Sequence, residues 1–300
     1  MSAQYFRFSA RTPPDPRRSL LLEQLLARAD TSASSSDWRL DAFRVIAPQA
    51  ASMPAVAAAA LFADRGVMEA AWVCIAAPVH YLAEMNNVRL AAEGMPTLRP
   101  DEAEALALDF NRVWSDSGTR LLAGRSAVLY CILDRALQVT TRDPEDVIGR
   151  HIEEYLPVGG GAPVLKRLMS EIEMWLFEHP VNGARAAQGL APITGLWLWG
   201  GGTGITSLPA IQGFCAGNDV FFNAFTRQAA GGGVIVMPDV PGSDAWHEAE
   251  SQWLKPAVAQ LREGVISRLD LSAGARGWSV SARAILRFWR RRKPWWEWFA

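Results

Sequence analysis

Residues 234–271, VIVMPDVPGSDAWHEAESQWLKPAVAQLREGVISRLDL, decide the predicted fold class. Residues 234–240 and 265–271 are apolar runs of strand length, and residues 243–262 between them have helical length and spacing. A strand, a long helix and another strand in this order favour parallel pairing. We therefore expect an α/β protein with a mainly parallel sheet and helices on both faces. Pro256 predicts a kink in the helix.

Further segments of both kinds precede this stretch. Strands are predicted at 70–77, 127–133, 136–141 and 195–199, and residues 38–46 are interpreted as extended. Helices are predicted at 19–29, 53–64, 103–114 and 163–177, with Pro180 opening another. The predicted organisation is an N-terminal leader and first helix (1–37), a single elaborated α/β domain (38–284) and a C-terminal tail (285–300).

The composition excludes several classes of protein. Half of the 300 residues are hydrophobic and 20% are charged, so the chain can bury a large core and is not expected to be disordered. Cys74, Cys131 and Cys215 are too few and too widely spaced for a disulfide scaffold. No signal peptide and no uninterrupted apolar span are found, so we expect a cytoplasmic protein without a transmembrane segment.

The charge is distributed unevenly along the chain. The net charge is −1, but residues 283–300 carry six basic side chains and one acidic one. The same end contains Trp289, Trp295, Trp296 and Trp298. Arginines interleaved with tryptophans can contact an anionic or protein partner, which we place at residues 287–298. The alternative is that the tryptophans pack onto the domain and leave the arginines exposed.

A glycine-rich block is the first candidate binding site. The strand at 195–199 leads into Gly200, Gly201 and Gly202, whose backbone N–H groups could approach an anion closely. Asn182 and Arg185 are three residues apart, on one face of a short predicted helix, and could complete the site. The alternative is a sharp turn, with Arg185 in a salt bridge. Walker-type and Rossmann-type glycine patterns are absent.

Polar residues near strand ends are the candidate catalytic groups. His80 follows the buried strand at 70–77, and Asp239, Asp244 and His247 follow the apolar residues 234–237. Ligands of open α/β sheets bind outside the carboxyl ends of the strands. Asp and His at this edge could bind a metal or form an acid/base pair. The alternative is that Asp244 caps its helix and His247 lies half-exposed on it.

The segment 171–202, EIEMWLFEHPVNGARAAQGLAPITGLWLWGGG, resembles the RpfE-type regulatory protein family, whose members are often labelled cofactor-independent phosphoglycerate mutase. The residues that carry the resemblance are Glu171, Met174, His179, Pro180, Val181, Asn182, Arg185, Gly189, Pro192 and 196–202, together with 78–80 and 288–293. The segment is also similar to archaeal-type mutases, which implies an alkaline-phosphatase-like fold. Those enzymes use two metal ions held by Asp and His clusters, and a serine that carries the phosphoryl group.

The chain departs from the mutase pattern in its catalytic residues. No early Asp-Gly precedes a serine, no Asp-x-x-Gly-His cluster occurs, and no Thr-x-Asp-His ending is present. We therefore expect a regulatory or binding protein, a pseudoenzyme whose ligand is a phosphorylated or carboxylated small molecule. One alternative is an active metal-dependent mutase or phosphatase with a nonstandard site and a divalent metal, Mn or Zn. Another is an interaction protein that acts through its basic aromatic C-terminus.

Overall fold

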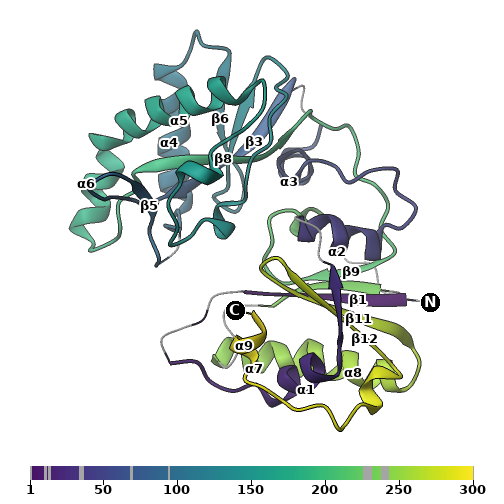
Figure 1. The fold of residues 1–300 in the computed structure, drawn as a ribbon. Helices are drawn as coiled ribbons and strands as arrows, with labels where there is room; N and C mark the ends of the chain where they lie inside the picture. Colours follow the sequence, from purple (N-terminus) through teal and green to yellow (C-terminus); the bar gives the residue numbers. More distant parts are fainter. Residues whose placement is uncertain are drawn as a thin grey trace. The chain divides into compact units, whose positions relative to one another are not determined.

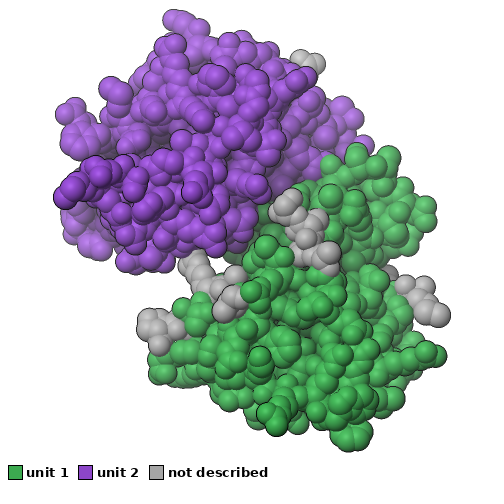
Figure 2. All heavy atoms as spheres, in the orientation of Figure 1, with its two compact units in different colours: residues 1–53, 209–300 green, residues 54–208 purple. Residues whose placement is uncertain are grey.

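The structure is a computed structural model of the chain, and it describes residues 2–9, 12, 15–33, 37–67, 70–93, 95–225, 232–237 and 243–299. The residues form two compact units. The first contains residues 1–53 and 209–300, and the second contains residues 54–208 (Figure 2). These units differ from the predicted organisation into a leader (1–37), a domain (38–284) and a tail (285–300). Whether the chain folds as the predicted domains stays a prediction.

The first unit is built on a mixed six-stranded sheet (Figure 1). Its strands, in spatial order, are β2 (Asp30–Ala33), β12 (Arg276–Ser281), β11 (Ile266–Ala273), β1 (Ser2–Phe8), β10 (Gly232–Val236) and β9 (Gly213–Ala216). β1 pairs in parallel with β10 and β11, and β10 pairs in parallel with β9. β12 pairs antiparallel with β11 and β2 at one edge. The predicted mainly parallel sheet is confirmed for this unit.

Helices cover both faces of this sheet. A core of buried side chains joins it to α1 (Leu20–Arg28), α7 (Asp244–Ala249), α8 (Lys255–Arg262) and α9 (Trp295–Phe299). Phe6 and Phe8 of β1 are completely buried in this core, as its alternating pattern requires. On the other face α2 (Trp38–Ile46) packs on β1 and β10. There Phe43 contacts the rings of Phe221 and Phe225.

Two sequence predictions fail in this unit. Residues 38–46 are helical, because the Asp37 carboxylate accepts hydrogen bonds from the backbone N–H groups of Arg39 and Leu40 and so caps a helix. Residues 2–8, assigned to a leader, form the central strand β1. A kink was predicted at Pro256 in the helix at 243–262. There the structure has a π-helical turn, Glu250–Leu254, directly before Lys255 and Pro256, and such turns interrupt the regular helix.

The second unit contains an antiparallel four-stranded sheet. Its order is β6 (Thr119–Ala123), β7 (Leu129–Leu133), β3 (Trp72–Val79) and β8 (Gly195–Gly202). The helices α3 (Val56–Arg65), α4 (Pro100–Val113) and α5 (Ala162–Phe177) pack on it, and α6 (Pro180–Ala187) follows α5. A hairpin of β4 (Tyr81–Ala83) and β5 (Val88–Leu90) completes the sheets. The strands predicted at 70–77 and 195–199 therefore form, but in an antiparallel sheet.

Short elements connect the longer ones. They are the 3-10 turns Pro144–Asp146, Glu153–Tyr155, Phe222–Ala224 and Ala284–Leu286, the last labelled η5. The predicted strand at 136–141 does not form, and only Thr140 makes an isolated bridge, to Val158. None of the described helices has both the length and the apolar composition needed to cross a bilayer.

Candidate functional site

The segment that leads into β8 is held together by Asn182, on the first turn of α6. Its side-chain amide donates to the carbonyl oxygens of Leu176 (2.9 Å) and Ile193 (2.8 Å), and its oxygen accepts from the backbone N–H of Ile193 (2.8 Å). One asparagine thus fixes the end of α5 and the approach to β8. These bonds give Asn182 a structural role, because they use the donors and the acceptor of its amide.

Arg185 forms a buried ion pair with Glu102 of α4. Its Nη1 lies 2.9 and 3.0 Å from the two carboxylate oxygens, and its Nε donates to the carbonyl of Ala191 at 2.7 Å. Glu102 is in addition the residue that caps α4, because its carboxylate accepts the backbone N–H of Arg99. The salt bridge that was the alternative for Arg185 is present, and the guanidinium is directed at protein groups.

The glycines of β8 allow close packing. A Cβ atom on Gly201 would overlap the indole ring of Trp72, and one on Gly202 would overlap the side chain of Ala55. Gly200 has a φ of +64°, and its N–H donates to the hydroxyl of Thr141 at 3.1 Å. The structure thus accounts for the three glycines by the neighbours of β8, and the anion site at Asn182, Arg185 and Gly200–Gly202 stays a prediction.

The candidate catalytic residues are distributed over both units. His80 lies at the end of β3 in the unit of residues 54–208, where its Nδ1 is buried and makes no hydrogen bond with a described residue. Asp244 and His247 are exposed on α7 in the other unit. Ser243, and not Asp244, caps α7 by accepting the N–H of Trp246. Asp239 lies outside the described residues.

The described part of the chain contains no cluster of candidate metal ligands. The Nδ1 of His247 lies 2.7 Å from the carbonyl oxygen of Ser243, one helical turn earlier, which leaves only its Nε2 for another partner. Among the residues that the structure describes, no three His, Cys, Asp or Glu side chains stand close enough to hold a metal ion together.

The cysteines do not offer a nucleophile either. All three are buried with free thiols, and burial raises the pKa of Cys215 to about 12. Cys74 and Cys131 are opposite each other on β3 and β7, and burial likewise raises the pKa of Cys74 well above its ordinary value. A protonated thiol is a poor nucleophile, so these side chains serve the core.

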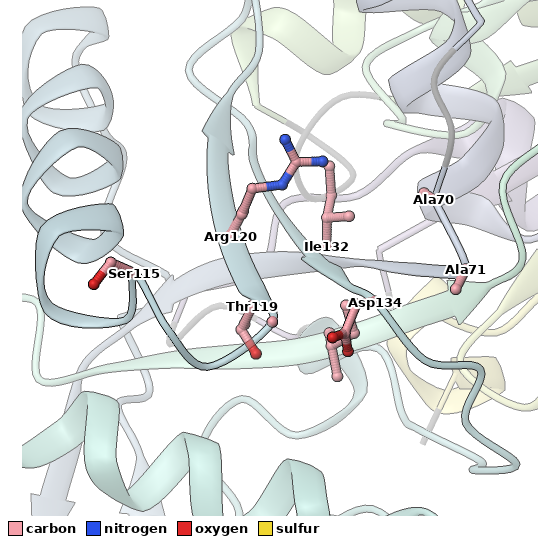
Figure 3. A pocket seen from close by; sticks show the side chains of 9 residues that line it. Ala70, Ala71, Ser115, Thr119, Arg120, Ile132 and Asp134 are labelled. Carbon is pink, nitrogen blue, oxygen red and sulfur yellow. The ribbon is translucent and has the colours of Figure 1, made fainter.

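A pocket of about 580 Å³ lies where β6 and β7 meet the residues before β3 (Figure 3). Its polar side chains are those of Ser115, Thr119, Arg120 and Asp134. The exposed Arg120 and the exposed Asp134 give it one charge of each sign, and the hydroxyls add neutral hydrogen-bonding groups. Such a lining suits a small polar ligand. Nothing in the sequence singles out these residues as a group, because only the pairing of β6 with β7 brings them together.

The comparisons with known proteins place part of this chain near phosphoglycerate mutases. It is 35% identical over 85 residues to the 2,3-bisphosphoglycerate-independent phosphoglycerate mutase of Methanothrix thermoacetophila, a match to 28% of this chain and 22% of that protein. It is 28% identical over 152 residues to the mutase of the same name from Methanosarcina mazei, with coverages of 48% and 38%. The chain thus spans less than half the length of these relatives. No family model matches the sequence.

Among solved structures, the chain is similar to the cofactor-independent phosphoglycerate mutase from Thermoplasma acidophilum, with a TM-score of 0.36 and 11% sequence identity. The similarity covers 93% of this chain and 89% of that one. The predicted similarity to phosphoglycerate mutases is therefore confirmed in sequence over part of the chain. The assignment to the RpfE type stays a prediction.

Proposed function

We propose that this chain is a phosphoglycerate-mutase-like protein of the RpfE type that acts in the cytoplasm by binding, in a regulatory role, and not by phosphoryl transfer. The observation that carries the proposal is the use of Asn182 and Arg185. Both belong to the segment that resembles the mutases, and both bind the protein's own groups. A segment whose polar side chains bind the protein's own groups stabilises the fold, and these side chains are not available for phosphoryl transfer.

The chemistry of phosphoryl transfer supports the same proposal. Two-metal catalysis requires several carboxylates and imidazoles around ions about 3.5–4 Å apart, because the metals clamp the attacking and leaving oxygens. The described candidates Asp244 and His247 are exposed on one helix, and one imidazole nitrogen of His247 is already engaged. This arrangement favours a binding role.

A mutase assay tests the proposal directly. Interconversion of 3-phosphoglycerate and 2-phosphoglycerate is followed by phosphorus NMR with added Mn²⁺, and the metal content of protein purified without chelators is measured in parallel. We expect no interconversion above the rate without protein and no stoichiometric metal. EDTA-sensitive interconversion would overturn the proposal and favour the rival, an active mutase or phosphatase that uses Mn or Zn with His80, Asp239, Asp244 and His247.

The ligand class that we propose is a phosphorylated or carboxylated metabolite, and the pocket of Figure 3 is where we place it. Arg120 supplies the cation, since Arg185 is committed to Glu102. Calorimetry with 3-phosphoglycerate and related carboxylates measures the affinity. Arg120→Ala should weaken binding about tenfold or more, because a charge-assisted hydrogen bond is lost. Arg125→Ala, at an exposed arginine outside the pocket lining, is the matched control. Equal affinities of both variants would place the ligand elsewhere.

A further inference from the structure

The segment from the last residue of η5 to the start of α9 presents an apolar and basic surface, which we call the terminal loop surface. It consists of Leu286, Phe288, Trp289, Arg291, Arg292 and Lys293. The three apolar side chains are 68%, 81% and 68% exposed in that order, although they are among the most hydrophobic residue types. Three exposed apolar side chains within four positions are unusual for a soluble surface, where such side chains scatter singly.

The chain on both sides of this surface is fixed to the first unit. Before it, Ala284 and Ile285 are buried in the core, and after it Trp295 is completely buried and donates its indole N–H to the carbonyl of Arg17. Between these points Arg287 bonds to Asp30, and Arg290 donates to the carbonyl of Ala29 at the end of α1. Figure 1 shows the loop, in yellow, along the outer side of α1. The apolar side chains are thus held outward.

The charges of the surface are uncompensated. Arg291, Arg292 and Lys293 are exposed, and none of them forms an ion pair within the described part of the chain. The nearby carboxylate of Asp30 is already paired with Arg287. A surface with three free cations beside apolar side chains attracts an anionic partner and offers it apolar contact as well.

We propose that the terminal loop surface binds an anionic lipid bilayer, with Phe288, Trp289 and Leu286 inserted among the headgroups and the cations on the lipid phosphates. Aromatic and aliphatic side chains flanked by Lys and Arg are the composition of peripheral membrane-binding segments. Nucleic acid is less favoured, because bases stack on free ring faces. Phe288 and Trp289 instead pack edge to face, with ring centroids 5.4 Å apart, and Leu286 offers no stacking face.

Vesicle flotation with the full chain tests the proposal. The vesicles contain phosphatidylcholine alone or mixed with anionic phosphatidylglycerol, and we expect binding only to the anionic mixture. Reversing the charges in Arg291→Glu, Arg292→Glu and Lys293→Glu should lower the partition coefficient at least a hundredfold, since each basic residue contributes about fivefold and the reversal adds repulsion. Phe288→Ser with Trp289→Ser should abolish binding. Met174→Ser with Phe177→Ser, at exposed apolar positions of α5, is the matched control and should bind like the wild type.

A fluorescent label gives a second measurement. The native cysteines are buried, so an environment-sensitive dye on Phe288→Cys can be attached selectively, with Phe177→Cys as control. The dye at position 288 should brighten and shift to the blue with anionic vesicles, and the control should not. Absence of wild-type binding to anionic vesicles, or equal loss in the control variants, would overturn the proposal, as would binding of single-stranded oligonucleotides in place of vesicles. The result is independent of the mutase assay.

Discussion

The guanidinium of Arg185 in α6 lies 2.9 Å from the carboxylate of Glu102 in α4, and the two side chains are only 3% and 4% exposed. The pair connects residues 83 positions apart. Because Glu102 also caps α4 and Arg185 also binds the loop after α6, the pair holds two helices and a loop together. The segment 171–202 is therefore part of the framework of its unit.

Breaking this pair should be costly. Arg185→Ala is expected to lower the free energy of unfolding by about 3–5 kcal/mol, because the Glu102 carboxylate stays buried without its partner. Arg185→Met combined with Glu102→Leu removes both charges and should recover much of the loss. Urea unfolding followed by circular dichroism measures both. Arg167→Ala is the control, since its ion pair with Glu171 is exposed and should change stability by less than about 1 kcal/mol. Equal losses in the single and double variants would contradict the prediction.

The glycine run makes a second prediction, on packing. Gly201→Ala should destabilise the unit by about 1–3 kcal/mol, because the added methyl group meets the rigid ring of Trp72. Gly183→Ala is the matched control. It lies inside α6 with no atom within 4 Å of the added Cβ, so it should stabilise by about 0.5–1 kcal/mol. Thermal unfolding distinguishes the two. A neutral Gly201→Ala would contradict this packing role of the glycine.

The sequence predicted the helices better than the sheets. Helical spacing located α1 and α5 to within a few residues, and alanine-rich composition or a proline at the helix start located α3, α4 and α6. β1 was missed, because its neighbours β10 and β11 lie more than 200 residues away in the chain. The antiparallel arrangement of β3 and β8 was missed for the same reason, since an apolar run does not reveal the direction of its partner.

The candidate site shows the same limit. A salt bridge of Arg185 was foreseen as an alternative, but Glu102 could not be named as its partner from a distance of 83 residues. The glycines at the end of β8 were interpreted as an anion-binding turn, since Trp72 and Ala55 come next to them only in the folded unit. Ser243 precedes Asp244 in the chain, and either could have capped α7. For Arg185 and for the start of α7, the sequence therefore left the hydrogen-bond partners open.

His179 predicts a dependence of stability on pH. Burial lowers its pKa below the ordinary 6.5, and the nearby Asp109 only partly opposes this shift. The unfolded chain therefore takes up a proton at a higher pH than the native state, so stability should fall as the pH falls below about 6.5. His179→Asn keeps an oxygen that can cap α6 as the Nδ1 atom does, and should flatten this dependence. Urea unfolding at neutral and mildly acidic pH measures the slope. An unchanged slope would contradict the assignment.

The last prediction concerns the C-terminal residues 285–300, which either belong to the core of the first unit or form a separate tail that binds a partner. Trp295 is completely buried and its ring contacts Phe299, which in turn contacts the rings of Phe8 and Trp278. Removal of residues 285–300 should therefore leave the first unit unstable and poorly soluble. Trp295→Ala alone should cost about 3–5 kcal/mol, the usual loss for a large buried aromatic side chain. Trp289→Ala is the control within the same segment. Its side chain is 68% exposed, so its loss should change stability by less than about 0.5 kcal/mol. A truncated chain that unfolds at the same temperature as the full chain would contradict the packing of Trp295. It would favour the alternative that the C-terminus is a separate interaction segment.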